Sequence, residues 1–219
     1  MFRDRTDAGQ QLAARLKGRT FHQPLVLAIP RGGIAVGAVL ADELNAELDV
    51  VLSRKLRAPQ QPELAIGAIS EGGEVYLNVY GSGGYGISEQ YLEQEKQHQM
   101  QEIARRKELF RSVRPQAELA GRSIIVTDDG IATGSTMIAA LQLLRTVLPH
   151  ELLVAVPVGP RERLSEIGQL CDEVVCLLTP IEFYAIGQFY EDFSQIEDDE
   201  VVEALRNHYA AAHPEQQLK

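Results

Sequence analysis

The sequence contains no tryptophan and only two cysteines, Cys171 and Cys176. This pair provides neither a disulfide framework nor the ligand spacing of a zinc site. Cys176 lies inside an apolar run, so we expect it to be a small residue of the core. Functions that depend on a disulfide scaffold or a structural zinc ion are therefore not expected.

Basic residues are also fewer than acidic ones, with 21 Lys and Arg against 31 Asp and Glu. A net charge of -10 argues against a general nucleic-acid binder, whose affinity rests on neutralising phosphates, although a local basic site remains compatible with it. No apolar run approaches membrane-spanning length, and Met1–Arg5 has no apolar core of a signal peptide. We expect a cytoplasmic protein that contacts no membrane.

Short apolar runs alternate with helical patterns over most of the chain, whose 219 residues suit one α/β domain with small appendages. This alternation predicts a mainly parallel central sheet with helices on both faces. Expected strands are 25–29, 48–53, 124–127, 152–158 and 173–178, and expected helices are 7–17, 34–41, 88–111, 137–147 and 161–170.

The stretch 124–137 combines an apolar strand, two acids, a loop of small and hydroxylated residues, and an apolar helix. Free backbone N–H groups and the dipole at a helix start favour an anion, and Thr133, Ser135 and Thr136 add hydroxyl donors. Asp128 and Asp129 would repel a phosphate, but they suit hydroxyl groups or a hydrated cation beside it. The stretch therefore predicts a site for a phosphate next to a sugar diol. An ordinary strand-to-helix turn needs only one short polar cap, so it explains this set less well.

A second unit of strand, glycine loop and helix surrounds Arg31-Gly32-Gly33. Two glycines let the backbone approach an anion closely, and arginine supplies charge. Taken alone, the loop is better explained as a tight turn that requires glycine, but beside the first motif an anion site is favoured. Arg54 and Lys55 follow the run 48–53, and the carboxyl end of a core strand is where α/β sheets bind ligands. The alternative is a solvated pair of cations.

Gly81–Gly86 matches the G-x-G-x-x-G pattern of dinucleotide-binding proteins. The run before it mixes polar and apolar residues, the next strand begins only near Ser123, and no strand-end acid follows at about 20 residues. We reject a dinucleotide site and expect a flexible connector.

The acid pair followed by Thr133-Gly134-Ser135-Thr136 resembles the phosphoribosyl-pyrophosphate (PRPP) signature of type I phosphoribosyltransferases. Motif order and spacing extend the resemblance over about 24–178, and the fit is best to predicted bacterial phosphoribosyltransferases of undefined acceptor. The resemblance implies one domain over 1–219, with a lid over about 56–86 and a C-terminal hood and helix over about 179–212.

The resemblance also implies roles for individual residues in moving 5-phosphoribose from PRPP to a nitrogenous acceptor. Arg54, Lys55, Asp128 and Asp129 would be catalytic, and the acid pair would hold Mg²⁺ indirectly. PRPP would be bound by Asp128, Asp129, Gly130, Ile131, Ala132, Thr133, Gly134, Ser135 and Thr136, and its pyrophosphate by Arg31, Gly32, Gly33, Arg54 and Lys55.

A dense aromatic cluster follows the last expected strand and includes Phe183, Tyr184, Phe189 and Tyr190. In the hood of such an enzyme these rings would stack on the acceptor base, while the alternative is a hydrophobic flap packed on the core. The helix 88–111 has a narrow apolar stripe, so it lies along the domain edge or meets a second copy in a homodimer.

Two other functions remain open at this stage. The same fold serves as a non-catalytic sensor of PRPP or a nucleotide, although Arg54-Lys55 and a lid favour an enzyme. An unrelated phosphatase-like protein is disfavoured, because the loop has no Cys, Ser–His or Asp-x-Asp nucleophile.

Overall fold

A computed structural model describes residues 1–78, 81 and 86–213 of the chain. Five parallel strands form the core sheet in the order β2-β1-β6-β7-β8, which confirms the predicted central sheet. The strands are β1 (Leu25–Ala28), β2 (Glu47–Val50), β6 (Ser123–Thr127), β7 (Glu151–Val158) and β8 (Glu173–Leu178).

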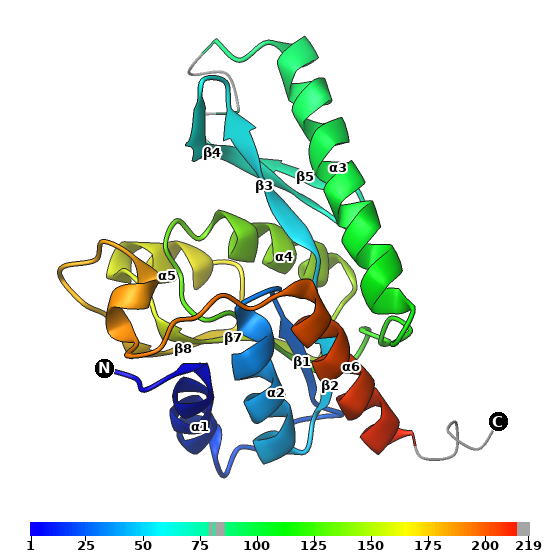
Figure 1. The fold of residues 1–219 in the computed structure, drawn as a ribbon, viewed down its shortest axis with the longest axis vertical. Coiled ribbons are helices and arrows are strands. Elements are labelled where there is room, and N and C mark those ends of the chain that lie inside the picture. Colours follow the sequence, from blue (N-terminus) through cyan, green and yellow to red (C-terminus); the bar gives the residue numbers. More distant parts are fainter. Residues whose placement is uncertain (79–80, 82–85, 214–219) are drawn as a thin grey trace.

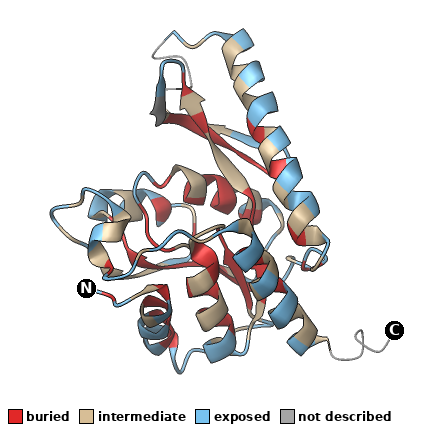
Figure 2. Ribbon diagram, viewed as in Figure 1, coloured by how far each residue is buried: buried red, intermediate tan, exposed pale blue. Residues whose placement is uncertain are grey.

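Helices cover both faces of this sheet, as the continuous apolar runs predict for parallel strands. Alternate residues of one strand enter different clusters: Leu25 and Leu27 pack with helices α4 and α5, whereas Val26 and Ala28 pack with α1, α2 and α6. The buried layer is visible between the helices in Figure 2. The helices are α1 (Arg5–Leu16), α2 (Gly33–Leu44), α4 (Ser135–Thr146), α5 (Arg161–Ile167) and α6 (Asp198–Ala212).

A second, antiparallel sheet and a long helix form an arm that extends from the core (Figure 1). Its strands are β3 (Ser53–Ala58), β4 (Gln61–Ser70) and β5 (Val75–Leu77), and its helix is α3 (Glu89–Arg111). The prediction of one strand over 48–53 was wrong at its C-terminal end, because β2 ends at Val50. Although the N–H of Val51 still donates to Ala28, the carbonyl of Leu52 accepts from Glu71 in the arm. Arg54 and Lys55 therefore lie in β3 of the arm, not directly at the end of a core strand.

Strands β4 and β5 form an antiparallel hairpin in which Ala68 pairs with Tyr76. Much of the stretch 56–86, expected as a flexible lid, is thus ordered into strands of the second sheet. Four residues of the G-x-G-x-x-G stretch, 82–85, lie outside the described residues, so its interpretation as a connector stays a prediction.

The start of the chain meets the segment that precedes α6. The N–H of Phe2 donates to the carbonyl of Phe189 at 2.8 Å, and the N–H of Glu191 donates to Phe2 at 2.9 Å. A short 3-10 turn, Ile186–Phe189, precedes this contact, and α6 follows it. Within the described ranges, no helix is long and apolar enough to cross a bilayer.

Strands that follow β1 in the sequence are added to the sheet first on one side of β1 and then on the other. The connection through α2 places β2 on one side of β1, while β6 lies on the other side and leads to β7 and β8. The register pairs Ala28 with Thr127, so β1 and β6 end at the same level. Ligands of open α/β sheets bind in the crevice outside the strand ends at such a switch point.

Candidate active site

The two loops predicted to bind a ligand start from these neighbouring strand ends and touch each other. A Cβ built on Gly32 would overlap the carboxylate of Asp129, and one on Gly33 would lie 3.0 Å from the Cα of Asp128. Glycine is therefore required here by close approach, as the sequence suggested. The structure joins the Arg31-Gly32-Gly33 turn and the acid pair into one site.

The loop after the acid pair presents a helix start to the solvent. Gly134 caps α4 with φ 76°, a left-handed conformation that favours glycine. The N–H of Ile131 donates to the carbonyl of Val158 at 2.8 Å, and the Ile131 side chain is buried, which anchors the loop. Ala132 and Thr133 are exposed, and Ser135 and Thr136 open the helix. This is the geometry of an anion site at a helix N-terminus.

The two carboxylates of the site have different partners. Asp128 accepts the backbone N–H of Asp129 through Oδ1 at 2.8 Å. Asp129 is buried, and its Oδ2 accepts from Nε of Arg5 at 2.8 Å. Burial, and then repulsion from Asp129, raises the pKa of Asp128 well above the usual carboxyl value. Burial also raises the pKa of Asp129, and the Arg5 hydrogen bond offsets part of that rise.

A cavity of about 330 Å³ opens beside Asp128 and Thr136, and its other wall is basic. Burial, and then repulsion from Arg106, lowers the pKa of Arg54 in this wall. Gathering like charges is unfavourable by itself, so such a wall is typical of an anion site. The cations that line the cavity are Arg31, Arg54, Lys55, Arg57 and Arg106.

Polar contacts from α3 fix the basic wall. Nε of Arg54 donates to Oε1 of the buried Gln99 at 2.7 Å, and Gln99 donates to Glu95 at 2.9 Å. The same Glu95 oxygen accepts the N–H of Arg57 at 3.0 Å. The long helix is therefore an integral support of the site rather than only an edge of the domain.

The acids at the start of α6 face two of these cations. Arg31 forms an ion pair with Glu197 at 2.8 Å, and Nε of Arg106 lies 3.7 Å from Asp198. Acids at this end of a helix also stabilise its start, and the N–H of Glu197 donates to Glu200 at 2.7 Å.

The four aromatic residues proposed to hold the acceptor are in different environments. Tyr184 is 84% exposed, and Phe183 and Phe189 are half-buried with ring centres 5.4 Å apart. Tyr190 is buried between Phe2 and Phe193, and its hydroxyl donates to the carbonyl of Asp129 at 2.7 Å. Because its ring is covered, we no longer include Tyr190 among the acceptor-binding residues.

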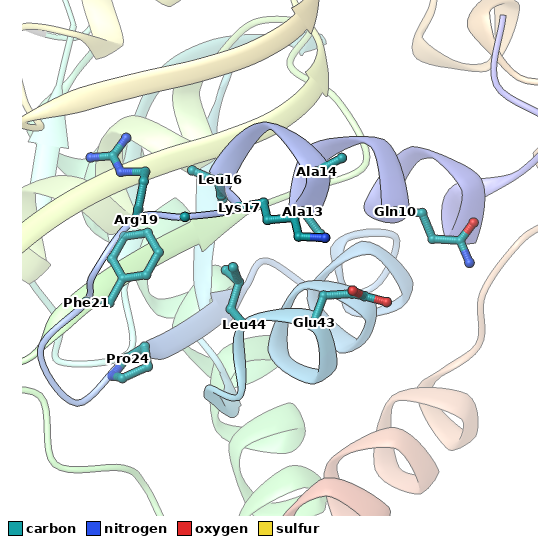
Figure 3. Close-up of a pocket in the computed structure, with 11 residues that line it drawn as sticks. Gln10, Ala13, Ala14, Leu16, Lys17, Arg19, Phe21, Pro24, Glu43 and Leu44 are labelled. Carbon is teal, nitrogen blue, oxygen red and sulfur yellow. The ribbon is translucent and has the colours of Figure 1, made fainter.

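A second cavity, of about 500 Å³, lies away from this site between the carboxyl ends of α1 and α2 (Figure 3). Pro24, which precedes β1, lines it, so it opens at the opposite edge of the sheet. It therefore has no part in the site at the strand ends.

Comparison with known proteins places the chain in a family. Residues 4–194 match the model of the phosphoribosyl transferase domain, so the chain belongs to that family. The resemblance seen in the sequence is thereby confirmed.

Particular relatives agree with this assignment. The chain is 44% identical over 205 residues to a protein named "Putative phosphoribosyl transferase Rv0571c" in Mycobacterium tuberculosis H37Rv, and equally to its counterpart in strain CDC 1551. The match covers 94% of this chain and 46% of each relative, so the chain spans about half their length. The crystal structure of TT1426 from Thermus thermophilus is 41% identical, with a TM-score of 0.82 and coverage of 94% of this chain and 98% of that one.

Sequence reasoning missed two basic residues of the site. Arg5 lies on an amphipathic helix 124 positions before its partner Asp129, and Arg106 lies in a basic run of the long helix. Neither residue follows a core strand, which was the signal used to find Arg31, Arg54 and Lys55. An Arg at the apolar boundary of a helix was the only available hint.

The raised pKa of Asp128 makes a prediction about stability. Between the usual carboxyl value and the raised one, the folded protein binds more protons than the unfolded chain, so stability falls as the pH rises through that window. Asp128→Asn keeps an acceptor for the Asp129 N–H and removes the charge. We expect its melting temperature at pH 7 to exceed that of the wild type by about 2–4 °C, which corresponds to about 1 kcal/mol.

Asp172→Asn is a matched control, for which we expect the melting temperature to change in the opposite direction. The hydrogen bond from Arg145 lowers the pKa of Asp172, so that pair stabilises the fold at neutral pH and less so in acid. Asp172→Asn should therefore lower the melting temperature at pH 7. Scanning calorimetry from pH 4 to 8 measures both, and a gain for Asp128→Asn that does not shrink toward pH 4 contradicts the assignment.

Proposed function

We propose that the protein transfers 5-phosphoribose from PRPP to a nitrogen nucleophile and releases pyrophosphate. Membership of the phosphoribosyl transferase family supports a transferase in general. The observation that carries the specific reaction is the cavity in which a basic wall faces Asp128 and Thr136. PRPP matches these features: its phosphate would bind near Thr136, its ribose diol at Asp128 and its pyrophosphate at the basic wall.

Each part of PRPP has a matching group. The 5-phosphate would bind at the start of α4, where Thr133, Ser135 and Thr136 and the helix N–H groups can donate to it. The ribose hydroxyls would donate to Asp128, which lines the cavity. The pyrophosphate would lie against Arg54 and Lys55 in β3, with the Gly32–Gly33 turn close by.

The reaction then requires positioning and charge stabilisation more than a protein nucleophile. The bond between ribose C1 and the pyrophosphate oxygen breaks, and its electron pair leaves with the pyrophosphate. The acceptor nitrogen forms the new bond to C1 and releases its proton. Arg54 and Lys55 stabilise the charge that grows on the departing oxygens, and the Asp128 carboxylate stabilises the positive charge that develops on the ribose.

Magnesium fits this site only together with the substrate. The described residues contain no cluster of three or more His, Cys, Asp or Glu that could hold a metal by themselves. Mg²⁺ usually binds through one or two carboxylates, waters and substrate phosphates, so Asp128 would contact it through water. When bound, the ion neutralises phosphate charge. Asp129 suits this role less well than the sequence suggested, because Arg5 already occupies its Oδ2.

The acceptor would enter from the hood side of the site. Ile186 packs against Gly130, which brings the 183–189 segment next to the PRPP loop. Phe183, Tyr184 and Phe189 remain available to contact a planar base. Ala132, in the loop before α4, bears on which base can be used.

The basic wall gives the test of this function. Arg54→Ala and Lys55→Ala should weaken PRPP binding and reduce turnover by about 10²-fold or more, because removal of one preorganised charge-stabilising group typically costs this much. The affinity for a nucleoside 5-monophosphate, which has no pyrophosphate, should change little. Calorimetric titration with each ligand and a pyrophosphate-release assay measure these effects. Equal losses for both ligands would place the two side chains elsewhere, and PRPP binding without turnover for any acceptor would favour the sensor.

Ala132 makes a prediction about the acceptor. In 6-oxopurine phosphoribosyltransferases the position before the Thr-Gly pair is an Asp, which can exchange a proton with the base. Here that position is Ala132, as in the adenine-type enzymes that this loop resembles more closely, and alanine can neither donate nor accept a proton. General acid–base assistance is worth about 10²–10⁴ in rate. We expect negligible pyrophosphate release with hypoxanthine or guanine, in assays that include adenine and the pyrimidines. Efficient use of either 6-oxopurine would show that Ala132 does not limit the choice of base.

A further inference from the structure

Arg106 is a cation of the site whose hydrogen-bonding capacity the protein leaves partly unused. It lies in α3, lines the cavity together with Asp128, and has a side chain that is only 16% exposed. Its Nε is buried and has no hydrogen-bond partner in the described part of the chain. Arg54 in the same wall, by contrast, donates to Gln99 at 2.7 Å. A buried guanidinium with an unbonded N–H is unfavourable, so this arrangement requires an explanation.

The acid that pairs with Arg106 does not supply the missing bond. Oδ1 of Asp198, at the start of α6, lies 3.7 Å from Nε of Arg106, which is too far for a hydrogen bond. This Oδ1 is itself buried without a hydrogen-bond partner, while Oδ2 accepts from Nη2 of Arg105 at 3.0 Å. Asp198 is therefore bonded to Arg105, and it attracts Arg106 through charge alone.

Arg106 and Arg54 place their charges in the same part of the cavity wall. Gln99, which holds Arg54, lies about two turns before Arg106 on α3, so both residues are on the same side of that helix. The pKa of Arg54 is lowered by burial and then by the charge of Arg106, so the two guanidinium groups are close enough to repel each other. An anion bound to both groups would remove this repulsion and accept charge-assisted hydrogen bonds.

We propose that Arg106 is a further binding residue for the pyrophosphate group of PRPP, where it acts beside Arg54. This role rests on the proposed function, because it adds a residue to the pyrophosphate end of the same site. A guanidinium is planar and can donate two parallel hydrogen bonds to one phosphate group. Two guanidinium groups in one wall therefore suit an anion with two linked phosphates. The 5-phosphate has its own donors at the start of α4, so ligands with and without pyrophosphate distinguish the two ends of the site.

Arg105 provides a matched control for Arg106. It is the preceding residue of α3, carries the same charge and pairs with the same acid, Asp198. Its side chain is 53% exposed, and it is not one of the described residues that line the cavity. Substitution of either arginine by glutamine changes the net charge equally and removes one partner of Asp198. The difference between the two variants therefore measures what Arg106 contributes at the cavity.

The experiment is calorimetric titration of the wild type, Arg106→Gln and Arg105→Gln with three ligands: inorganic pyrophosphate, PRPP and ribose 5-phosphate, each with Mg²⁺. Arg106→Gln should bind pyrophosphate and PRPP about 10- to 100-fold more weakly, the usual cost of a lost hydrogen bond between charged groups. Its affinity for ribose 5-phosphate, which has no pyrophosphate, should change little. Arg105→Gln should stay within about threefold of the wild type for all three ligands, as expected for an exposed charge.

Equal losses of Arg106→Gln for all three ligands, or an equal loss in Arg105→Gln, would indicate a general effect of structure or charge and overturn the proposal. Wild-type affinity of Arg106→Gln for pyrophosphate and PRPP would also overturn it, while leaving the proposed function intact. If Arg106→Gln does not fold, Asp198→Asn is compared with the double variant Asp198→Asn/Arg106→Gln, in which no acid is left unpaired. Equal pyrophosphate affinities of these two then contradict the proposal. Failure of the wild type itself to bind PRPP overturns the proposed function, and the role of Arg106 with it.

Discussion

The site depends on the parallel pairing of β1 with β6, which makes the two strands end at the same level. From that edge one strand continues into the Arg31-Gly32-Gly33 turn and the other into Asp128-Asp129 and the loop to α4. The turn lies so close to the acids that a side chain at Gly32 would overlap Asp129. The arm, the hood and the first helix then add their side chains around this fixed contact.

The charged groups at this site are arranged in a way that is unfavourable for the stability of the folded protein. Two adjacent carboxylates lie under the turn with raised pKa values, and a basic wall faces them across the cavity. Buried like charges destabilise a folded protein, so positions of this kind are typical of functional sites. Arg5 beside Asp129 and Glu197 beside Arg31 reduce the repulsion without filling the cavity. The arrangement is suited to a ligand that carries both hydroxyl groups and several negative charges.

The sequence predicted those parts of the site that local pattern controls. The runs 25–29 and 124–126 are apolar throughout because both faces of a parallel sheet are buried. The loop after the first strand contains the glycines that close approach requires. The end of β2 could not be found in this way, because Val51 and Leu52 are as apolar as the strand before them, and it is the bond from Glu71 that directs the chain into the arm. The roles of Arg5 and Tyr190 were likewise hidden, since both depend on contacts with Asp129, which is far from either residue in the sequence.

The most direct test of the account is a crystal structure of the protein with PRPP and Mg²⁺. The account predicts the 5-phosphate at the start of α4 against Thr133, Ser135 and Thr136, the ribose hydroxyls on Asp128, and the pyrophosphate against Arg54 and Lys55. It also predicts that the Arg5–Asp129 ion pair persists in the complex. A PRPP molecule bound with its pyrophosphate at α4, or bound outside the cavity between β1, β6 and the arm, would contradict it.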